Sequence, residues 1–147
     1  MAKAYLAFDY GTKRIGLAIG NDLTRSSQPL SAIATKQVVN AQNEITLTTL
    51  QPIIETWRVK HLVFGLPLGS EGEETPLSKR IRKLGNRLSA KLAMPVSFAD
   101  ERYSSGEADR LMREHQQPGK RFKTKDILLR DSVAAQLILD VYFSEMG

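Results

Sequence analysis

The chain of 147 residues contains no cysteine and only two histidines. The absence of cysteine excludes disulfides, thiolate metal sites and cysteine nucleophiles, and it suits an intracellular protein. No apolar run approaches the roughly 18 residues that a membrane-spanning helix needs. The first residues hold a single lysine and then a strand pattern with an acidic residue, unlike a signal peptide. We therefore expect a cytoplasmic protein without a membrane partner.

The length fits a single domain over residues 1–147, which can bury about two thirds of its unfolded surface. Lysine and arginine number 21 against 16 acidic residues, giving a net charge of +5. This excess permits a polyanionic partner but does not demand one. The sequence shows no internal repeat and no linker.

The order of strand-like and helix-like segments predicts a mixed α/β protein. Two β-prone runs, 5–8 and 15–19, are joined through a glycine-containing stretch and predict a hairpin, with a third strand at 29–35. The further segments are a helix at 42–57 that contains Pro52, a strand at 60–65, a helix capped by Thr75, a strand at 95–99, a helix after Ser104 or Ser105, a polar loop at 115–125 and a helix at 126–144. The strand-helix-strand crossovers make the later strands parallel, with helices on the faces of the sheet.

Asp9 follows the apolar run at 5–8 directly, which is an unusual place for a carboxylate. A buried charge there would cost several kcal/mol unless cations or hydrogen-bond donors compensate. Alternatively, Asp9 opens the turn and accepts amide hydrogen bonds from Gly11 or Thr12.

Asp131 falls at helical spacing with Ala134 and Ile138, on the stripe of the last helix that should face the sheet. The small side chains of Ala134 and Ala135 would let this helix approach a strand closely. Alternatively, the helix is rotated slightly and Asp131 pairs with Arg130 or Lys125 at the edge of the stripe.

Glu101 lies at the carboxyl end of a predicted strand, where ligand sites of open α/β sheets gather. Its neighbour Asp100 points to the opposite face by strand alternation, so only one of the two can join a given cluster. The alternative is ordinary loop chemistry, with Glu101 paired to Arg102. Carboxylates that cluster repel each other and call for a divalent cation, and ligands made only of oxygen favour Mg²⁺ or Mn²⁺.

Four motifs resemble, in order and spacing, the YqgF-type (RuvX) family. They are Phe8–Gly16, Gly65–Leu68, Asp100–Ser104 and Asp131–Ala135, and together they span essentially the whole chain. This family is similar to the RuvC Holliday junction resolvases. The resemblance implies a ribonuclease-H-like fold with a five-stranded mixed sheet of order 3-2-1-4-5 flanked by helices. It also implies metal-dependent hydrolysis of phosphodiester bonds, with a role in maturing the 5′ end of small-subunit ribosomal RNA.

Carried over by position, Asp9, Glu101 and Asp131 are the expected catalytic and metal-binding carboxylates. We hypothesise a two-metal mechanism in which Asp9 and Asp131 hold one ion and Asp9 and Glu101 share the other. The expected partner is nucleic acid, either structured RNA, including pre-ribosomal particles, or branched DNA. The sequence marks no dimer face.

Cations that could contact nucleic acid lie near these motifs. Lys13 and Arg14 follow Asp9, and Arg102 follows Glu101. The loop before the last helix interleaves cations with an aromatic residue that could stack on a base: Lys120, Arg121, Phe122, Lys123 and Lys125. A second basic stripe, formed by Arg80, Lys83, Arg87 and Lys91, is spaced for one helix face and is ordinarily just a solvated surface.

Two other functions fit parts of the sequence. The stretch at 9–12 also looks like the first phosphate motif of actin-like sugar kinases and chaperone ATPases, but those proteins need a second domain to close over ATP. A non-catalytic RNA-binding or ribosome-assembly protein is the more serious alternative, because its carboxylates would be structural.

Overall fold

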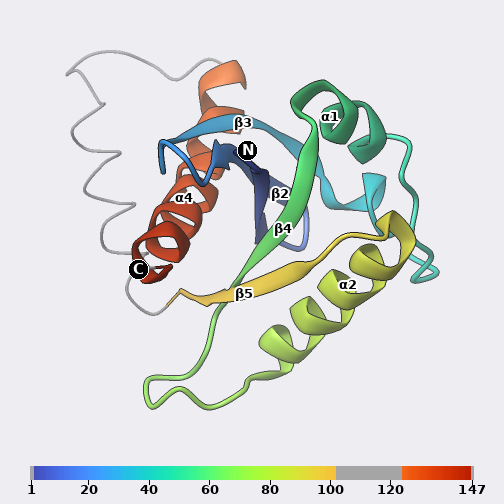
Figure 1. The fold of residues 1–147 in the computed structure, drawn as a ribbon. Coiled ribbons are helices and arrows are strands. Elements are labelled where there is room, and N and C mark those ends of the chain that lie inside the picture. The colour runs from blue at the N-terminus through green and yellow to red at the C-terminus, as the bar shows by residue number, and fades with distance from the viewer. Residues whose placement is uncertain (1, 102–123, 147) are drawn as a thin grey trace, which may run out of the picture.

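The computed structural model describes residues 2–101 and 124–146, with side chains in the last segment from Ser132 onward. Its centre is a five-stranded sheet of order β3-β2-β1-β4-β5 (Figure 1). The strands are β1 (Ala4–Tyr10), β2 (Arg14–Asn21), β3 (Ser27–Ala34), β4 (Val59–Leu66) and β5 (Val96–Asp100). The first three strands pair antiparallel, whereas β4 pairs parallel with both β1 and β5. The predicted fold class and strand order are confirmed.

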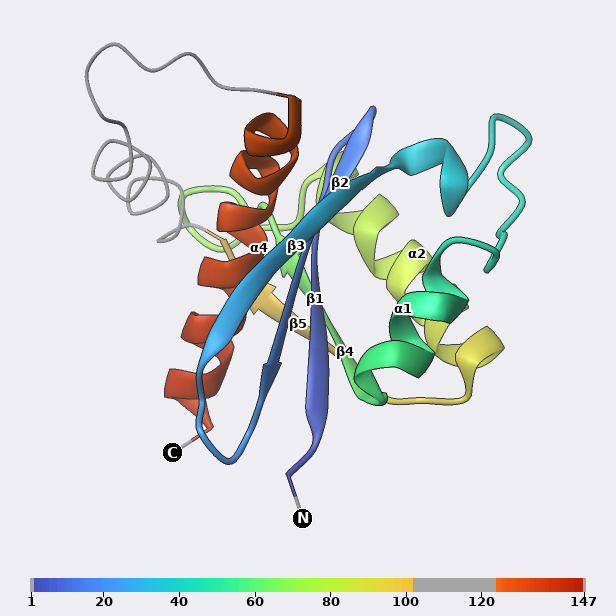
Figure 2. The ribbon, with the colours of Figure 1, turned by 90° about the horizontal axis from the view of Figure 1, so that it is seen from above.

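Helices cover both faces of the sheet. They are η1 (Thr35–Gln37), α1 (Leu50–Trp57), α2 (Pro76–Leu92) and α4 (Thr124–Glu145). In Figure 2, α1 and α2 lie on one side of the strands and α4 lies on the other. No helix in residues 2–101 and 124–146 is long and apolar enough to cross a membrane.

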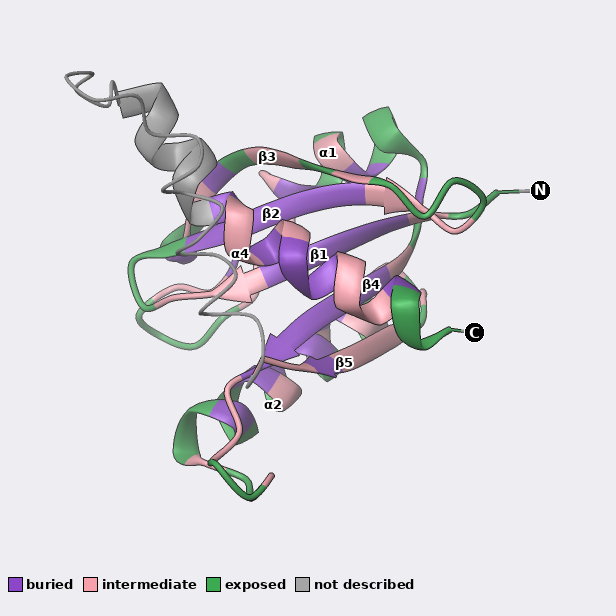
Figure 3. Ribbon diagram, turned by 90° about the vertical axis from the view of Figure 1, so that its left-hand side faces the viewer, coloured by how far each residue is buried: buried purple, intermediate pink, exposed green. Residues whose placement is uncertain are grey.

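The alternation of side chains along β1 divides the core between these two layers. Leu6 and Phe8 belong to the cluster under α1 and α2, and the Phe8 ring stacks on Phe64 at 4.3 Å between ring centroids. Tyr5 and Ala7 belong to the smaller cluster under α4. Both faces of β1 are buried, as the purple strands in Figure 3 show, so this strand is the centre of the fold.

The helix predicted at 42–57 is wrong in its first half, because α1 begins only at Leu50. The preceding residues form turns and an isolated bridge between Val39 and Ile45. Pro52 explains the boundary: proline is tolerated in the first turn of a helix, where its missing N–H needs no partner, and disfavoured further along. The apolar residues at 45 and 47 therefore reach the core from irregular backbone.

The predicted cap of α2 is confirmed. Thr75 has extended backbone and its Oγ1 accepts a hydrogen bond from the Ser78 amide at 3.0 Å, followed by Pro76 at the first position of the helix. The buried stripe includes Ile81, Leu84 and Leu88 as the spacing predicts. Leu77, expected on that stripe, is instead exposed.

The last helix begins two residues earlier than predicted, at Thr124, so positions 124 and 125 belong to α4 and not to the preceding loop. The predicted helix after Ser104 or Ser105 and the loop from 115 to 123 lie outside the described residues.

A buried hydrogen bond fixes α4 on the sheet. The register of β2 against β3 shifts between Ile15 and Leu17, and the Leu17 amide donates to Ser132 Oγ on α4 at 3.0 Å. Further along the helix, Gln136 Nε2 donates to the Ser27 carbonyl at 3.2 Å. The irregular β2–β3 register thus supplies a docking point for the helix.

Replacing Ser132→Ala should lower the free energy of unfolding by about 1–3 kcal/mol, because the Leu17 amide would stay buried without its acceptor. Ser144→Ala is the matched control, since Ser144 Oγ donates to the Val141 carbonyl at an exposed position of the same helix. The control should change stability by less than about 0.5 kcal/mol. Chemical denaturation measures both, and equal effects would contradict the docking role of Ser132.

Candidate active site

Asp9 lies inside β1 and not in the turn that follows it. It is the second-to-last residue of the strand, and it pairs with Gly16 on the neighbouring strand β2. By alternation it shares the α4 face of the sheet with Tyr5 and Ala7. The interpretation of Asp9 as the residue that opens the turn is therefore not favoured by its position in the sheet.

Glu101 reaches the same face from the other side of β4. Its amide donates to the Leu66 carbonyl at 3.0 Å, which continues the parallel ladder one residue beyond β5. Ala99 is buried under α4, so Glu101, two residues later, falls on that face, whereas Asp100 falls on the other. The prediction that Asp100 and Glu101 point to opposite faces agrees with this register.

Gly65 on the intervening strand makes room for the two carboxylates. Phe8 pairs with Phe64 and Gly65 pairs with Ala99, so Gly65 lies between the ends of β1 and β5. A Cβ atom at Gly65 would stand 2.6 Å from Glu101 Oε1 and would also collide with Ile138 of α4. Only glycine lets the Glu101 side chain lie across β4 toward Asp9.

The two carboxyl groups share a hydrogen bond. Burial, followed by the hydrogen bond and the negative charge of Asp9 and the charge of Asp100, raises the pKa of Glu101 from its ordinary 4.5 to about 8. One proton is thus held between two acids at neutral pH, as expected where like charges are close and partly desolvated.

Asp131, the third predicted carboxylate, is placed through its neighbour. Ser132 is hydrogen-bonded to the Leu17 amide, and Leu17 pairs with Phe8, next to the pair of Asp9 and Gly16. The backbone at position 131 therefore lies beside the part of the sheet that carries Asp9. The side chain of Asp131 is outside the described residues.

The donor set suits a divalent cation of the magnesium type. Asp9 and Glu101 offer only oxygen ligands, and the proton between them occupies a place where a cation would relieve the repulsion. No group of three metal-ligating side chains gathers within the described part of the chain. Position 131, which the sequence predicts as the third ligand, has its side chain outside that part.

The cations predicted to bind nucleic acid are only partly described. Lys13 and Arg14 are exposed at the β1–β2 connection, immediately after the strand that holds Asp9. Arg102, Lys120, Arg121, Phe122 and Lys123 lie outside the described residues, and of Lys125 the structure describes only the backbone, in the first turn of α4.

The sequence did not predict the structural roles of two residues of the site, Gly65 and Ser132. Gly65 was part of a motif, but nothing in the sequence shows that a side chain from a different strand lies over it. Ser132 was likewise only a motif residue, although a serine on an otherwise apolar helix stripe signals a buried hydrogen bond, because burying a hydroxyl requires a partner.

The sheet order and the helices on its two faces define a ribonuclease-H-like fold of the kind found in RuvC resolvases. The structure of RuvC from Thermus thermophilus superposes with a TM-score of 0.52 over 98% of this chain and 96% of that chain, at 11% sequence identity. The yeast mitochondrial Holliday junction resolvase Ydc2 gives a TM-score of 0.50 over 97% of this chain and 79% of that one, also at 11% identity. At such identity the likeness shows the fold alone.

The chain belongs to the RuvX family. The family model, described as Holliday junction resolvase, matches residues 3–145. A protein of Burkholderia vietnamiensis named "Putative pre-16S rRNA nuclease" is 40% identical over 143 residues, covering 97% of this chain and 90% of the relative. A protein of the same name from Chromohalobacter salexigens is 38% identical over 140 residues, covering 95% of this chain and 88% of the relative.

The raised pKa of Glu101 makes stability depend on pH in the metal-free protein. Between pH 4.5 and about 8 the folded state holds a proton that the unfolded state has released, so the free energy of unfolding falls as pH rises through this range. Below pH 4.5 the full stability is present, and above pH 8 the loss from this group is complete.

Urea denaturation in EDTA between pH 4 and 9 checks this dependence. Glu101→Gln removes the titrating group, so the difference in stability between the variant and the wild type should grow with pH and level off above pH 8. The difference cancels the contributions of other titrating groups, including Asp140, whose pKa burial also raises. A constant difference across the range would show that Glu101 titrates normally.

Proposed function

We propose that this protein is a metal-dependent nuclease that hydrolyses phosphodiester bonds in the 5′-end processing of pre-16S ribosomal RNA, acting on pre-ribosomal particles in the cytoplasm. The observation that carries the proposal is the pair of Asp9 and Glu101, which are hydrogen-bonded to each other on the α4 face of the sheet next to the backbone of position 131. The names of the relatives that are about 40% identical support RNA as the substrate.

The proposed roles follow from the positions of the residues. Asp9, Glu101 and Asp131 would hold two Mg²⁺ or Mn²⁺ ions, with Asp9 shared between them. The ions would supply an activated water and charge stabilisation for the leaving oxygen. Lys13 and Arg14, exposed just after Asp9, would contact phosphates of the bound strand.

The cost of holding Asp9 and Glu101 together supports this assignment. Holding a second carboxylate against Asp9 in a partly buried position disfavours the charged form of Glu101, in line with its raised pKa. A chain that only bound RNA would gain nothing from this repulsion. A nuclease gains a site in which a cation binds strongly because it replaces the shared proton.

A second candidate is the resolution of branched DNA. The printed description of the matching family model, Holliday junction resolvase, favours it. The same carboxylates would serve either substrate, since phosphodiester hydrolysis is common to both. A non-catalytic RNA-binding role in ribosome assembly is the third possibility and differs in having no metal-dependent activity.

Asp9→Asn should abolish Mn²⁺-dependent cleavage while leaving the fold intact, because asparagine keeps the shape of the side chain but not its charge. Purified protein would be assayed on precursor ribosomal RNA beside a four-way DNA junction, which also separates the two substrates. Asp22→Asn is the matched control, since Asp22 lies after β2 and accepts a hydrogen bond from the Lys3 amide at the opposite end of the hairpin. Undiminished cleavage by Asp9→Asn would remove Asp9 from the active site.

Mn²⁺ should raise the melting temperature of the wild-type protein by several degrees at a concentration of about one hundred times its dissociation constant. The shift should disappear in Glu101→Gln and in Asp131→Asn and persist in Asp22→Asn. Thermal melts with and without the metal measure it. The absence of a metal effect in the wild type, together with tight RNA binding, would favour the non-catalytic role.

A further inference from the structure

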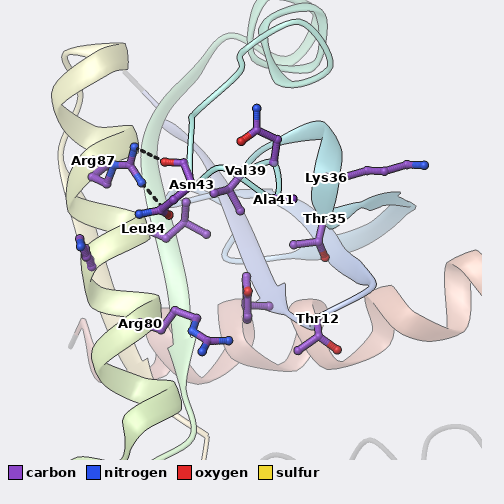
Figure 4. A pocket seen from close by; sticks show the side chains of 12 residues that line it. Thr12, Thr35, Lys36, Val39, Ala41, Asn43, Arg80, Leu84 and Arg87 are labelled. Atoms are coloured by element: carbon purple, nitrogen blue, oxygen red, sulfur yellow. Dashed lines mark hydrogen bonds between the residues drawn. The ribbon is translucent and has the colours of Figure 1, made fainter.

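A basic pocket lies on the face of the sheet opposite Asp9 and Glu101. Its volume is about 450 Å³, and four segments line it: the end of β1 with the following turn, η1, the loop after η1, and α2 (Figure 4). Its polar and charged lining residues are Tyr10, Thr12, Thr35, Lys36, Asn40, Asn43, Arg80, Lys83 and Arg87. Arg80, Lys83 and Arg87 belong to the basic stripe of α2. Such a stripe is ordinarily a solvated surface, but here these three residues line a pocket.

Hydrogen bonds between the segments fix the walls of this pocket. The Thr35 amide donates to the Lys13 carbonyl at 2.9 Å and Thr35 Oγ1 donates to the Gly11 carbonyl at 2.6 Å, which ties η1 to the β1–β2 turn. On the far side, Arg87 donates to the Asn43 carbonyl at 2.8 Å and to Asn43 Oδ1 at 3.2 Å, as the dashed lines in Figure 4 show. The walls are thus formed before any ligand binds, which lowers the entropy cost of binding.

The loop between η1 and α1 is ordered by its own contacts. Asn40 Oδ1 accepts from the amides of Gln42 and Glu44, and the Asn40 amide donates to the Glu44 carbonyl. Asn43 adopts a left-handed backbone with φ of 62°. This tight turn holds Asn43 where Arg87 can bind it, so the loop forms a fixed wall of the pocket.

The charge of the pocket is entirely positive. Its lining includes four cations, Lys36, Arg80, Lys83 and Arg87, and no carboxylate. None of the four forms an ion pair with a carboxylate in the part of the chain that the structure describes. In Figure 4, Arg80 extends from α2 toward the turn that carries Thr12, whereas Lys36 points outward at the rim.

The chemistry of this lining matches a phosphate group. Guanidinium and ammonium groups compensate its charge, and hydroxyl and amide groups such as those of Thr12 and Asn40 can donate hydrogen bonds to its oxygens. The apolar side chains of Val39 and Leu84 complete the lining and provide a surface for the sugar or base attached to the phosphate. A nucleotide unit of a nucleic acid strand has all of these parts.

The pocket is connected to the carboxylate pair through β1. Tyr10, which lines the pocket, directly follows Asp9, so the two sites lie on opposite faces at the same end of one strand. The exposed Lys13 and Arg14 lie at the turn between the faces. A nucleic acid strand that passes over this turn would contact cations along its whole path from the pocket to the carboxylates.

We propose that the pocket between α2, η1 and the β1–β2 turn is a second subsite for the nucleic acid, which binds backbone phosphates of the strand that is cut at Asp9 and Glu101. That the bound strand is the one that is cut rests on the proposed nuclease function. Binding at the pocket can nevertheless be measured without cleavage.

The experiment compares two double variants of α2 that lose the same charge. Arg80→Gln with Lys83→Gln removes two pocket cations, and Lys79→Gln with Lys91→Gln removes two exposed cations of the same helix that do not line the pocket. Affinity for a fluorescent 12-nucleotide single-stranded RNA is measured by anisotropy in EDTA at several salt concentrations. Circular dichroism melts verify that both variants are folded.

The pocket variant should bind the RNA about tenfold more weakly, and the slope of log K against log salt should shrink by about 1.4, which corresponds to two phosphate contacts on a single strand. The control variant should stay within about twofold of the wild type. Equal weakening of both variants would overturn the proposal, because it would reflect net charge alone, and so would unchanged binding by the pocket variant.

The failure of this proposal and the failure of the nuclease function can be told apart. If the wild type shows no Mn²⁺-dependent cleavage but the pocket variant alone loses RNA affinity, the subsite stands and the catalytic role of the carboxylates falls. If cleavage depends on Asp9 but both double variants bind alike, the nuclease function stands and the subsite falls.

Discussion

The close approach of two carboxylates across Gly65 is the constraint on which the candidate site depends. Asp9 lies in β1 and Glu101 directly follows β5, on either side of β4, and they meet because the residue between them has no side chain. The contact is unfavourable by itself: burial and the negative charge of Asp9 raise the pKa of Glu101 to about 8. The parallel ladder, the Glu101 amide bonded to the Leu66 carbonyl, and Ile138 packed from α4 hold the groups together against this repulsion.

The position of α4 is subject to the same demand. Under the proposed function, α4 would carry a third carboxylate to this site, so it would have to be fixed along its axis as well as pressed against the sheet. Apolar contacts alone fix the axial position weakly. The hydrogen bond from the Leu17 amide to Ser132 Oγ supplies a directional contact, one residue from position 131. The register shift in β2 that serves this bond is therefore part of the site's construction.

Local patterns such as the Thr75–Pro76 pair were sufficient for the succession of strands and helices along the chain and for the cap of α2, whereas the order of strands in the sheet came from the resemblance to the RuvX family. Strand alternation also separated Glu101 from Asp100, and the resemblance to the family grouped Glu101 with Asp9. The start of α1 was wrong because apolar residues at 45 and 47 fit helical spacing although they reach the core from irregular backbone. The roles of Gly65 and Ser132 depend on contacts with residues far away in the chain, namely Glu101 and Leu17, and no local pattern contains them.

The sheet separates the cations of α2 from the carboxylates. Under the proposed function, this separation has a physical reason. An arginine beside Asp9 and Glu101 would pair with them, lower their pKa values and occupy the position of a metal ion. On the opposite face, Arg80 and Lys83 line a pocket that contains no carboxylate, so their charge stays available to phosphate. The β1–β2 turn then joins the two faces, because Asp9 and Tyr10 are consecutive and point in opposite directions. Under the two proposals, a sheet with a sharp turn at the end of its central strand would allow one strand of nucleic acid to be bound by cations on one side and cut by carboxylates on the other.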